Sequence, residues 1–242
     1  MKKTFKVSKL IADAGICSRR KAELLIKEGR VRLNNKILTS IPERASLKDL
    51  IKVDNKKINL KKETRLWKYY KPVGRLTTNY DPLGRKTIFD ELPKNLPRVI
   101  TIGRLDFNSE GLLLLTNSGS LARYLEIPKN SFIREYKVKV KGKIDLKKLK
   151  SLEKGIKIKG VKYKSIKVSI LEKNKNSAHI KLKLIEGKNR EIRKIMSFFG
   201  YRVNKLIRIS YGPFTLKSMK PGDVVEIHQK ILAQSLKFLK IS

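Results

Sequence analysis

The segment from residue 103 to residue 119, GRLDFNSEGLLLLTNSG, carries the residue types best suited to chemistry. Its run of four leucines predicts a buried strand, which would hold the preceding polar loop in place. Arg104 and Asp106 are two residues apart, so in an extended segment their side chains point the same way, opposite Leu105 and Phe107. Asp106 is therefore a candidate nucleophile or base at a glycosidic carbon or a base ring, in the charged form that basic neighbours favour.

Spacing alone leaves two other interpretations of this segment open. Asp106 could form an ordinary structural salt bridge with a neighbouring arginine. Glu110 could join Asp106 in a two-carboxylate glycosidase site, but nothing in the sequence fixes the distance between the two carboxylates.

The elements that would position this loop are short strands separated by turns and a few helices. Strand-like runs occur at residues 136–140, 156–158, 166–171 and 179–184. A helix is expected to begin after the turn at 187–189, and a last one at 231–239. This pattern predicts an α+β domain with a mixed, mainly antiparallel sheet.

The N-terminal part predicts a small module with two helices and a hairpin. Two strands, 31–33 and 36–38, are expected to flank the turn pair Asn34-Asn35. The helix limits follow from capping preferences, with Ser8 and Ser18 as N-caps and Gly15 and Gly29 as stops. A polar, lysine-rich stretch follows, so we place the boundary near residue 62, giving domains 1–62 and 63–242.

The charge balance points to a polyanionic partner. The 242 residues include 59 Lys and Arg against 21 Asp and Glu, a net charge of +38 that extends along the whole chain. Compositional bias can account for part of this excess. At Arg19, Arg20 and Lys21, however, cations crowd the start of a helix, where they oppose its dipole. They form either a solvated basic face or a contact with an external anion.

Several classes of protein are not expected. Cys17 is the only cysteine and His179 and His228 the only histidines, so neither a disulfide nor a zinc site is predicted. Charged residues near the start leave no apolar stretch long enough for export, and no run of eighteen apolar residues occurs elsewhere, which predicts a cytoplasmic protein with no membrane association. A chain this positive should resist self-association, so we expect a monomer.

Residues 7–37 resemble the S4 RNA-binding module. The shared pattern is a leading helix, Gly-x-x-Ser-Arg-Arg, a second helix and a Gly-Arg-Val hairpin. The resemblance implies that five residues contact RNA phosphates: Arg19, Arg20, Lys21, Arg30 and Arg32.

The rest of the chain resembles the RsuA/RluB branch of the pseudouridine synthases. GRLD, followed by Ser-Glu-Gly, a leucine run, Asn and Gly, is similar to the catalytic motif of that branch. Further matching segments follow the family's order: KPVGRLTT at 71–78, REYKVKV at 134–140, EGKNREIRKI at 186–195 and NKLIRISYGPFTL at 204–216. The implied fold is an S4-type module followed by a pseudouridine synthase catalytic domain.

The resemblance implies a cofactor-free isomerisation, in which uracil leaves its ribose, turns over and is reattached through carbon. Asp106 would be the essential carboxylate, acting on the sugar or as a base. Arg104 would take the place of the extruded nucleotide, and Tyr136 would stack on the target base unless it is a core tyrosine. Arg193 would hold Asp106, or else contact a phosphate. Other basic positions are interpreted as RNA-tracking: Lys71, Arg75, Arg85, Lys188, Arg190, Lys194, Lys205 and Arg208.

The implied partner is ribosomal RNA. The substrate is either the naked RNA or the RNA within an assembling ribosomal subunit. The motifs favour 23S, large-subunit RNA, with 16S, small-subunit RNA as the alternative. A non-catalytic S4-type assembly factor would not need the set Asp106, Tyr136 and Arg193. An S4-bearing methyltransferase would need a glycine-rich nucleotide loop, and phosphoryl transfer a Walker-type loop; the sequence has neither.

Overall fold

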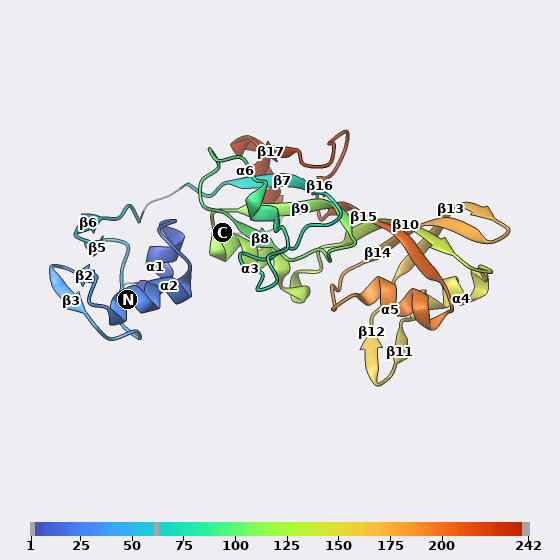
Figure 1. The fold of residues 1–242 in the computed structure, drawn as a ribbon, viewed down its shortest axis with the longest axis horizontal. Coiled ribbons are helices and arrows are strands. Elements are labelled where there is room, and N and C mark those ends of the chain that lie inside the picture. Colours follow the sequence, from blue (N-terminus) through green and yellow to red (C-terminus); the bar gives the residue numbers. More distant parts are fainter. Residues whose placement is uncertain (1–2, 61–62, 239–242) are drawn as a thin grey trace. The chain divides into compact units, whose positions relative to one another are not determined.

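A computed structural model of the chain describes residues 3–60 and 63–238. It divides into two compact units (Figure 1). The first comprises Met1–Arg65 with the short segments Asn95–Ile100 and Thr116–Gly119, and the second comprises Leu66–Lys94, Thr101–Leu115 and Ser120–Ser242.

The N-terminal unit contains the predicted helix, helix and hairpin. Its elements are β1 (Phe5–Lys6), α1 (Val7–Asp13), α2 (Arg19–Lys27), β2 (Val31–Leu33), β3 (Lys36–Leu38), β4 (Arg44–Ala45), β5 (Ile51–Val53) and β6 (Lys56–Lys57). The strands form a sheet of order β3-β2-β5-β6 and a separate pair, β1-β4. Apolar residues of both helices pack with residues of β2 and β5 into one core.

Local capping explains most of the helix limits in this unit. The Ser18 hydroxyl accepts a hydrogen bond from the Lys21 backbone N–H at 3.2 Å, as predicted for the start of α2. Gly29 follows α2 with a φ of +69°. The prediction for Ser8 is wrong, because α1 already begins at Val7 and Ser8 lies buried inside it. The helix begins two residues earlier than this cap would give, directly after strand β1, which pairs with β4.

The second unit is built on a nine-stranded sheet of order β13-β14-β10-β15-β9-β7-β17, with β16 beside β15 and β8 beside β9. Its strands are β7 (Leu66–Lys71), β8 (Ile100–Ile102), β9 (Glu110–Thr116), β10 (Arg134–Lys141), β13 (Lys167–Asn174), β14 (Ser177–Leu184), β15 (Arg202–Tyr211), β16 (Phe214–Thr215) and β17 (Val224–Glu226). Five pairs are antiparallel: β13-β14, β14-β10, β10-β15, β15-β16 and β7-β17. Strands β15 and β9 pair in parallel, with Ile207 opposite Glu110. The predicted α+β class with a mixed, mainly antiparallel sheet is confirmed.

Helices and one small hairpin complete this unit. They are α3 (Gly119–Glu126), α4 (Leu146–Ser151), α5 (Glu191–Phe198) and α6 (Gln229–Phe238), the 3₁₀ turns η1 (Ile88–Asp90), η2 (Pro128–Asn130) and η3 (Leu152–Lys154), and the hairpin strands β11 (Ile156–Ile158) and β12 (Val161–Tyr163). The predicted terminal helix corresponds to α6, although residue 239 lies outside the described residues. Among the helices of the described part of the chain, none is both long and apolar enough to cross a membrane.

Two features of the sheet position the site. The four leucines Leu112–Leu115 of β9 are completely buried, as the uninterrupted apolar run predicts for a central strand. In β10, buried and exposed residues alternate, so Tyr136 and Val138 lie on the covered face while Lys137 and Lys139 face solvent. Tyr136 is thereby directed toward the side of the sheet on which Ile180 and Leu182 of β14 are also buried.

Candidate active site

A pocket of about 860 Å³ lies within the second unit. Three segments contribute its chemistry: the loop 103–109 before β9, strand β10, and the turn before α5 together with the first turn of that helix. They supply Arg104 and Asp106, then Arg134 and Tyr136, then Lys188, Arg190 and Arg193. The structure thus brings together all three residues that the sequence proposed as catalytic. The volume is within the range typical of small-molecule sites.

The loop that carries Asp106 is fixed through its backbone. The Thr77 hydroxyl donates to the carbonyl oxygen of Leu105 at 2.8 Å, and the Gly74 N–H donates to that of Phe107 at 2.9 Å. The loop also closes on itself, because the Ser109 N–H donates to the Asp106 carbonyl at 3.0 Å.

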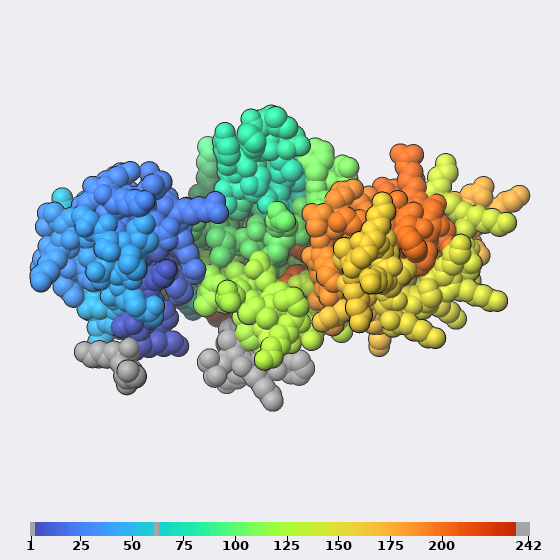
Figure 2. Space-filling model, turned by 90° about the horizontal axis from the view of Figure 1, so that it is seen from below, coloured from blue at the N-terminus to red at the C-terminus, as the bar shows by residue number. Residues whose placement is uncertain are grey.

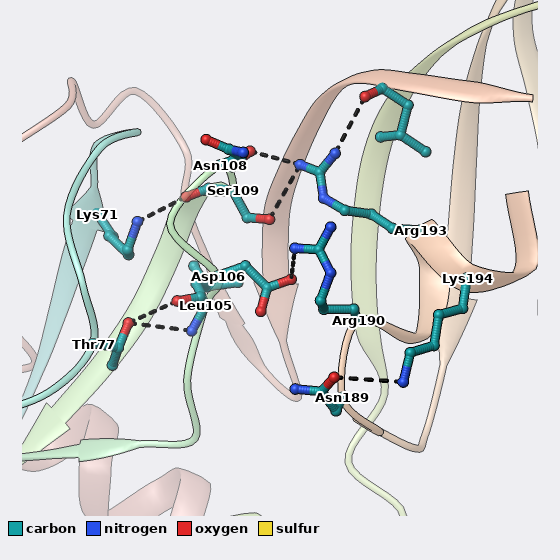
Figure 3. Close-up of polar contacts among 11 residues, drawn as sticks. Lys71, Thr77, Leu105, Asp106, Asn108, Ser109, Asn189, Arg190, Arg193 and Lys194 are labelled. Carbon is teal, nitrogen blue, oxygen red and sulfur yellow. Dashed lines mark hydrogen bonds and ion pairs between the residues drawn. The ribbon is translucent and has the colours of Figure 1, made fainter. Parts of the chain in front are cut away.

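Two cations hold the next two carbonyl groups (Figure 3). Arg193 donates from Nη2 to the Asn108 carbonyl oxygen at 2.6 Å, and Lys71 donates from Nζ to that of Ser109 at 2.9 Å. Every carbonyl group from residue 105 to residue 109 therefore accepts a hydrogen bond. A loop held at each peptide presents the Asp106 side chain in a defined position, which is what a catalytic carboxylate needs.

The prediction that Lys71 tracks RNA at the surface is wrong. Its side chain is fully buried, and its ammonium donates to the carbonyl oxygens of Pro72 and Ser109, both at 2.9 Å. Burial lowers the pKa of Lys71 to about 8, against the opposing effect of the Asp106 charge. Lys71 is thus an internal support of the loop that carries Asp106.

The predicted pairing of Arg193 with Asp106 is also not what the structure shows. The ion pair with Asp106 comes from Arg190, whose Nη1 lies 3.7 Å from the carboxylate Oδ2 (Figure 3). Arg193 instead bonds to the carbonyl of Asn108 and, from Nη1 at 3.2 Å, to that of Val203. Burial, together with the nearby Arg190 charge, lowers the pKa of Arg193.

The backbone explains this exchange of partners. Arg190 immediately precedes α5 and adopts a left-handed conformation with a φ of +51°. Its side chain therefore leaves the chain in a direction that a helical residue would not allow. Arg193 lies within the first turn of α5, and its side chain reaches the carbonyl groups of Asn108 and of Val203 in β15 rather than the carboxylate.

Tyr136 forms part of the pocket wall and is only 7% exposed. It faces Leu182 of β14 on one side and Arg208 of β15 on the other. Its position matches the expected stacking residue, and its low exposure also fits the alternative of a core tyrosine.

Behind this wall lies a polar network that the sequence did not single out. Arg134 donates to the Tyr211 hydroxyl at 2.7 Å, which in turn donates to the Leu125 carbonyl at 2.8 Å. The guanidinium of Arg134 also lies 4.6 Å from the centre of the Tyr211 ring. Both residues fall within matched segments, REYKVKV and NKLIRISYGPFTL, and so does Thr77. Their place in segments that match the family was the feature of the sequence that could have identified them as site residues.

The remaining basic positions divide into exposed and occupied ones. Arg208 was expected to track RNA, yet it is 2% exposed and its Nε donates to the Leu112 carbonyl at 2.7 Å, because it lies inside the sheet. Lys205 pairs with Glu110 at 3.0 Å, and Lys188 with Glu186 at 3.0 Å. Arg104 lies exposed at the pocket.

In the N-terminal unit, Arg19, Arg20 and Lys21 are exposed on the first turn of α2. Arg30, by contrast, is bound by Asp54 at 2.7 Å and by Glu28 at 3.1 Å. Arg32 is half-buried and donates to the Asn35 carbonyl at 3.3 Å. The first three cations are therefore more available to an external anion than the last two.

Chemically, the pocket offers one carboxylate beside a guanidinium, an aromatic wall and several cations. The Asp106 side chain is 32% exposed, so a ligand can reach it, and the Arg190 guanidinium lies 3.7 Å from its carboxylate. Among the residues described by the structure, no cluster of three or more His, Cys, Asp or Glu side chains is arranged to hold a metal ion. The arrangement suits attack by, or proton transfer to, a single carboxylate.

Comparisons with known proteins agree with this geometry. The RNA pseudouridylate synthase family model matches residues 65–198, and the S4 domain model matches residues 6–51. A Rickettsia felis protein described as an uncharacterized RNA pseudouridine synthase is 50% identical over 94% of this chain and 98% of its own length. Ribosomal large subunit pseudouridine synthase B of Bacillus subtilis is 39% identical over 92% of this chain and 91% of its own.

A solved structure described as a pseudouridylate synthase supports the fold. It superimposes with a TM-score of 0.67 over 95% of this chain and 98% of its own, at 24% sequence identity. Together, the fold and the pocket define an enzyme with an S4 RNA-binding domain and a base-isomerising domain. The chain belongs to the RNA pseudouridylate synthase family, and it is an RNA pseudouridine synthase.

Proposed function

We propose that this enzyme converts a specific uridine of 23S ribosomal RNA to pseudouridine, with Asp106 as its catalytic residue. The observation that carries the role of Asp106 is its place in the pocket, on a loop whose five successive carbonyl groups are all hydrogen-bonded. The choice of large-subunit RNA is supported by the Bacillus subtilis relative and by a Buchnera aphidicola relative of the same name, 39% identical over 90% of this chain.

In the proposed reaction, the bond between N1 of uracil and C1′ of ribose breaks, and a bond between C5 and C1′ forms. The proton on C5 is lost and N1 gains one, so the product is an isomer of the substrate and no redox partner is needed. Asp106 acts at C1′ or as the base that removes the C5 proton.

The target uridine must leave its base stack before it can turn over, at a cost of a few kcal/mol. Tyr136 offsets part of this cost, because stacking of a base on an aromatic ring contributes about 1–3 kcal/mol. Arg104, exposed at the pocket, is suited to fill the space that the extruded nucleotide leaves. Arg190, whose side chain is 47% exposed, is suited to a flanking phosphate.

The test is site-resolved pseudouridine mapping of ribosomal RNA from cells that lack this protein, complemented with wild type or Asp106→Asn. We expect one 23S site to disappear, wild type to restore it and Asp106→Asn to leave it unmodified. The variant removes the charge but keeps the size of the side chain, so RNA binding by the purified variant serves as the control for folding.

Each other outcome contradicts a different part of the proposal. A lost site in 16S RNA would reject the large-subunit assignment but keep the chemistry. Restoration by Asp106→Asn would reject Asp106 as the catalytic residue. No lost site at all would favour an RNA-binding role in ribosome assembly.

A further inference from the structure

Two large apolar side chains, Tyr80 and Leu83, are far more exposed than any other in the described part of the chain. Their exposed fractions are 76% and 74%, whereas the next largest is 57%, at Phe198. Both lie in the loop 77–86, between the end of β7 and η1. Isolated exposed apolar residues are common, but two at this degree of exposure on one short loop call for an explanation.

The exposure is not that of a loosely held segment, because the loop is closed at its base. The Leu76 N–H donates to the Lys86 carbonyl at 3.1 Å, and the Ile88 N–H donates to the Leu76 carbonyl at 2.9 Å. At the base, Thr87 and Asp90 form a capping box that fixes the start of η1.

The tip of the loop is equally well fixed. The Gly84 N–H donates to the Asp81 carbonyl at 3.1 Å, which closes a turn with Pro82 at its second position. Arg85 donates two hydrogen bonds to the Asp81 carboxylate, from Nη2 at 2.7 Å and from Nε at 3.0 Å. These bonds lower the pKa of Asp81 to about 2, so the pair stays charged at any physiological pH.

In this loop a charged side chain is covered and two apolar side chains are exposed, which is the reverse of the usual arrangement at a protein surface. The Asp81 side chain is 6% exposed, while Tyr80 and Leu83 on either side of it face solvent. Burying such apolar side chains would normally be favourable, at roughly 25 cal/mol per Å². A rigid loop that instead holds them outward is preorganised to contact a partner.

The position of the loop indicates which partner. Thr77 and Thr78, at its start, line the pocket, and Thr77 also bonds to Leu105 next to the catalytic aspartate. The segment around residues 75–90, in teal, stands out as a lobe in Figure 2. A nucleotide bound in the pocket thus has its neighbours in the RNA beside this loop, where the exposed Lys86 matches their phosphates.

We propose that Tyr80 and Leu83 bind unstacked bases of the RNA next to the target uridine. Tyr80 stacks on a base, and Leu83 inserts as an apolar wedge into a neighbouring base step, next to the space that Arg104 fills. Aromatic stacking and leucine wedges are both known ways for proteins to hold disrupted base stacks. The inference rests on the proposed function for its RNA but not on the identity of the uridine or the role of Asp106.

The test uses in vitro transcribed 23S RNA labelled with tritium at C5 of uridine, from which pseudouridine formation releases the label. Filter binding gives Kd, and single-turnover tritium release gives the rate. We expect Tyr80→Ala and Leu83→Ala each to reduce the single-turnover efficiency, the rate divided by Kd, by about 5- to 100-fold, the range that loss of one stacking contact predicts. Tyr80→Phe should remain within about 2-fold of wild type.

The control variant is Leu171→Ala, which removes an apolar side chain 47% exposed on β13. It should behave as wild type, and thermal melting should show all these variants equally stable. The salt dependence of RNA binding should also be unchanged, because stacking releases no counterions.

Equal Kd and equal rate for Tyr80→Ala, Leu83→Ala and wild type would overturn the proposal and would assign the pair to a protein partner. A smaller salt slope would overturn it as well, because that result would mean an electrostatic effect. If wild type releases no tritium, the proposed function fails, and the binding measurements still test the loop.

Discussion

At the scale of single residues, the loop that carries Asp106 depends on cations that bind its backbone. Lys71 and Arg193 each donate to a carbonyl oxygen of residues 108–109, and both are shielded from solvent to a degree that perturbs their pKa. A buried cation is costly unless it is hydrogen-bonded, so these two side chains and the loop carbonyls stabilise one another. Arg190 is left to balance the charge of Asp106 itself.

The lowered pKa of Lys71 predicts a pH-dependent contribution to stability. The folded state releases the proton near pH 8, whereas the unfolded chain keeps it up to about 10.5. Between these values the unfolded state binds more protons, so the contribution of Lys71 to the unfolding free energy rises with pH. The unfolding free energy of wild type, relative to that of Lys71→Met, should rise by on the order of 3 kcal/mol between pH 7.5 and 10.5.

Urea unfolding of the two proteins at several pH values measures this difference. The control is Lys137→Met, which removes a lysine from the exposed face of β10 and should show a difference from wild type that does not vary with pH. A constant difference between Lys71→Met and wild type would mean that Lys71 keeps its proton throughout the range.

At the scale of elements, the parallel contact between β9 and β15 joins the catalytic loop to the rest of the sheet. The register places Gly111 of β9 opposite Arg208 of β15. A Cβ added at Gly111 would lie 2.4 Å from the Arg208 carbonyl oxygen and 2.8 Å from its nitrogen. Only glycine allows the two backbones to approach this closely, so the position of the loop depends on this residue.

We therefore expect Gly111→Ala to destabilise the protein by more than about 3 kcal/mol, or to prevent folding. Gly103→Ala is the matched control, since Gly103 also has a positive φ, +70°, but nothing lies within 4 Å of an added Cβ. Gly103→Ala should lower the unfolding free energy by about 1–2 kcal/mol, from backbone strain alone. Urea unfolding measures both values, and equal losses would show that strain rather than the close strand contact matters at Gly111.

At the scale of the whole molecule, the charge of +38 makes RNA binding strongly dependent on salt. Binding by so many cations carries little sequence information, so selectivity must come from the residues around the pocket and from the way the N-terminal domain docks on folded RNA. Within that domain, Arg19, Arg20 and Lys21 project from the start of α2, and Ser18 caps this helix.

Replacing Arg19 and Arg20 together by Ala should weaken RNA binding and reduce the slope of log K against log salt by about 1.5, because two phosphate contacts are lost. Filter binding over a series of salt concentrations measures the slope. Arg30→Ala serves as the comparison and should change it less, since Asp54 and Glu28 already bind this arginine. An unchanged slope in the double variant would exclude the docking role.

Much of the fold was determined by short-range features that can be recognised in the sequence. Ser18, Gly29 and the pair Asn34-Asn35 set the ends of α2 and the first hairpin turn, because their preferences depend on neighbouring residues only. The leucine run of β9 was equally clear, as was the position of Asp106 just before it. The S4 and pseudouridine synthase motifs identified the family for the same reason: each is a continuous stretch of chain.

Only the tertiary structure decided how the basic residues are used. Lys71 and Arg208 were predicted to contact RNA and Arg193 to hold Asp106, yet all three donate to backbone carbonyl groups of segments far away in the chain. The partner of Asp106 depended on a positive φ at Arg190, and the start of α1 on the pairing of β1 with β4. A cation's role follows from which oxygen atoms the fold brings within about 3 Å of it, and local sequence does not contain that distance.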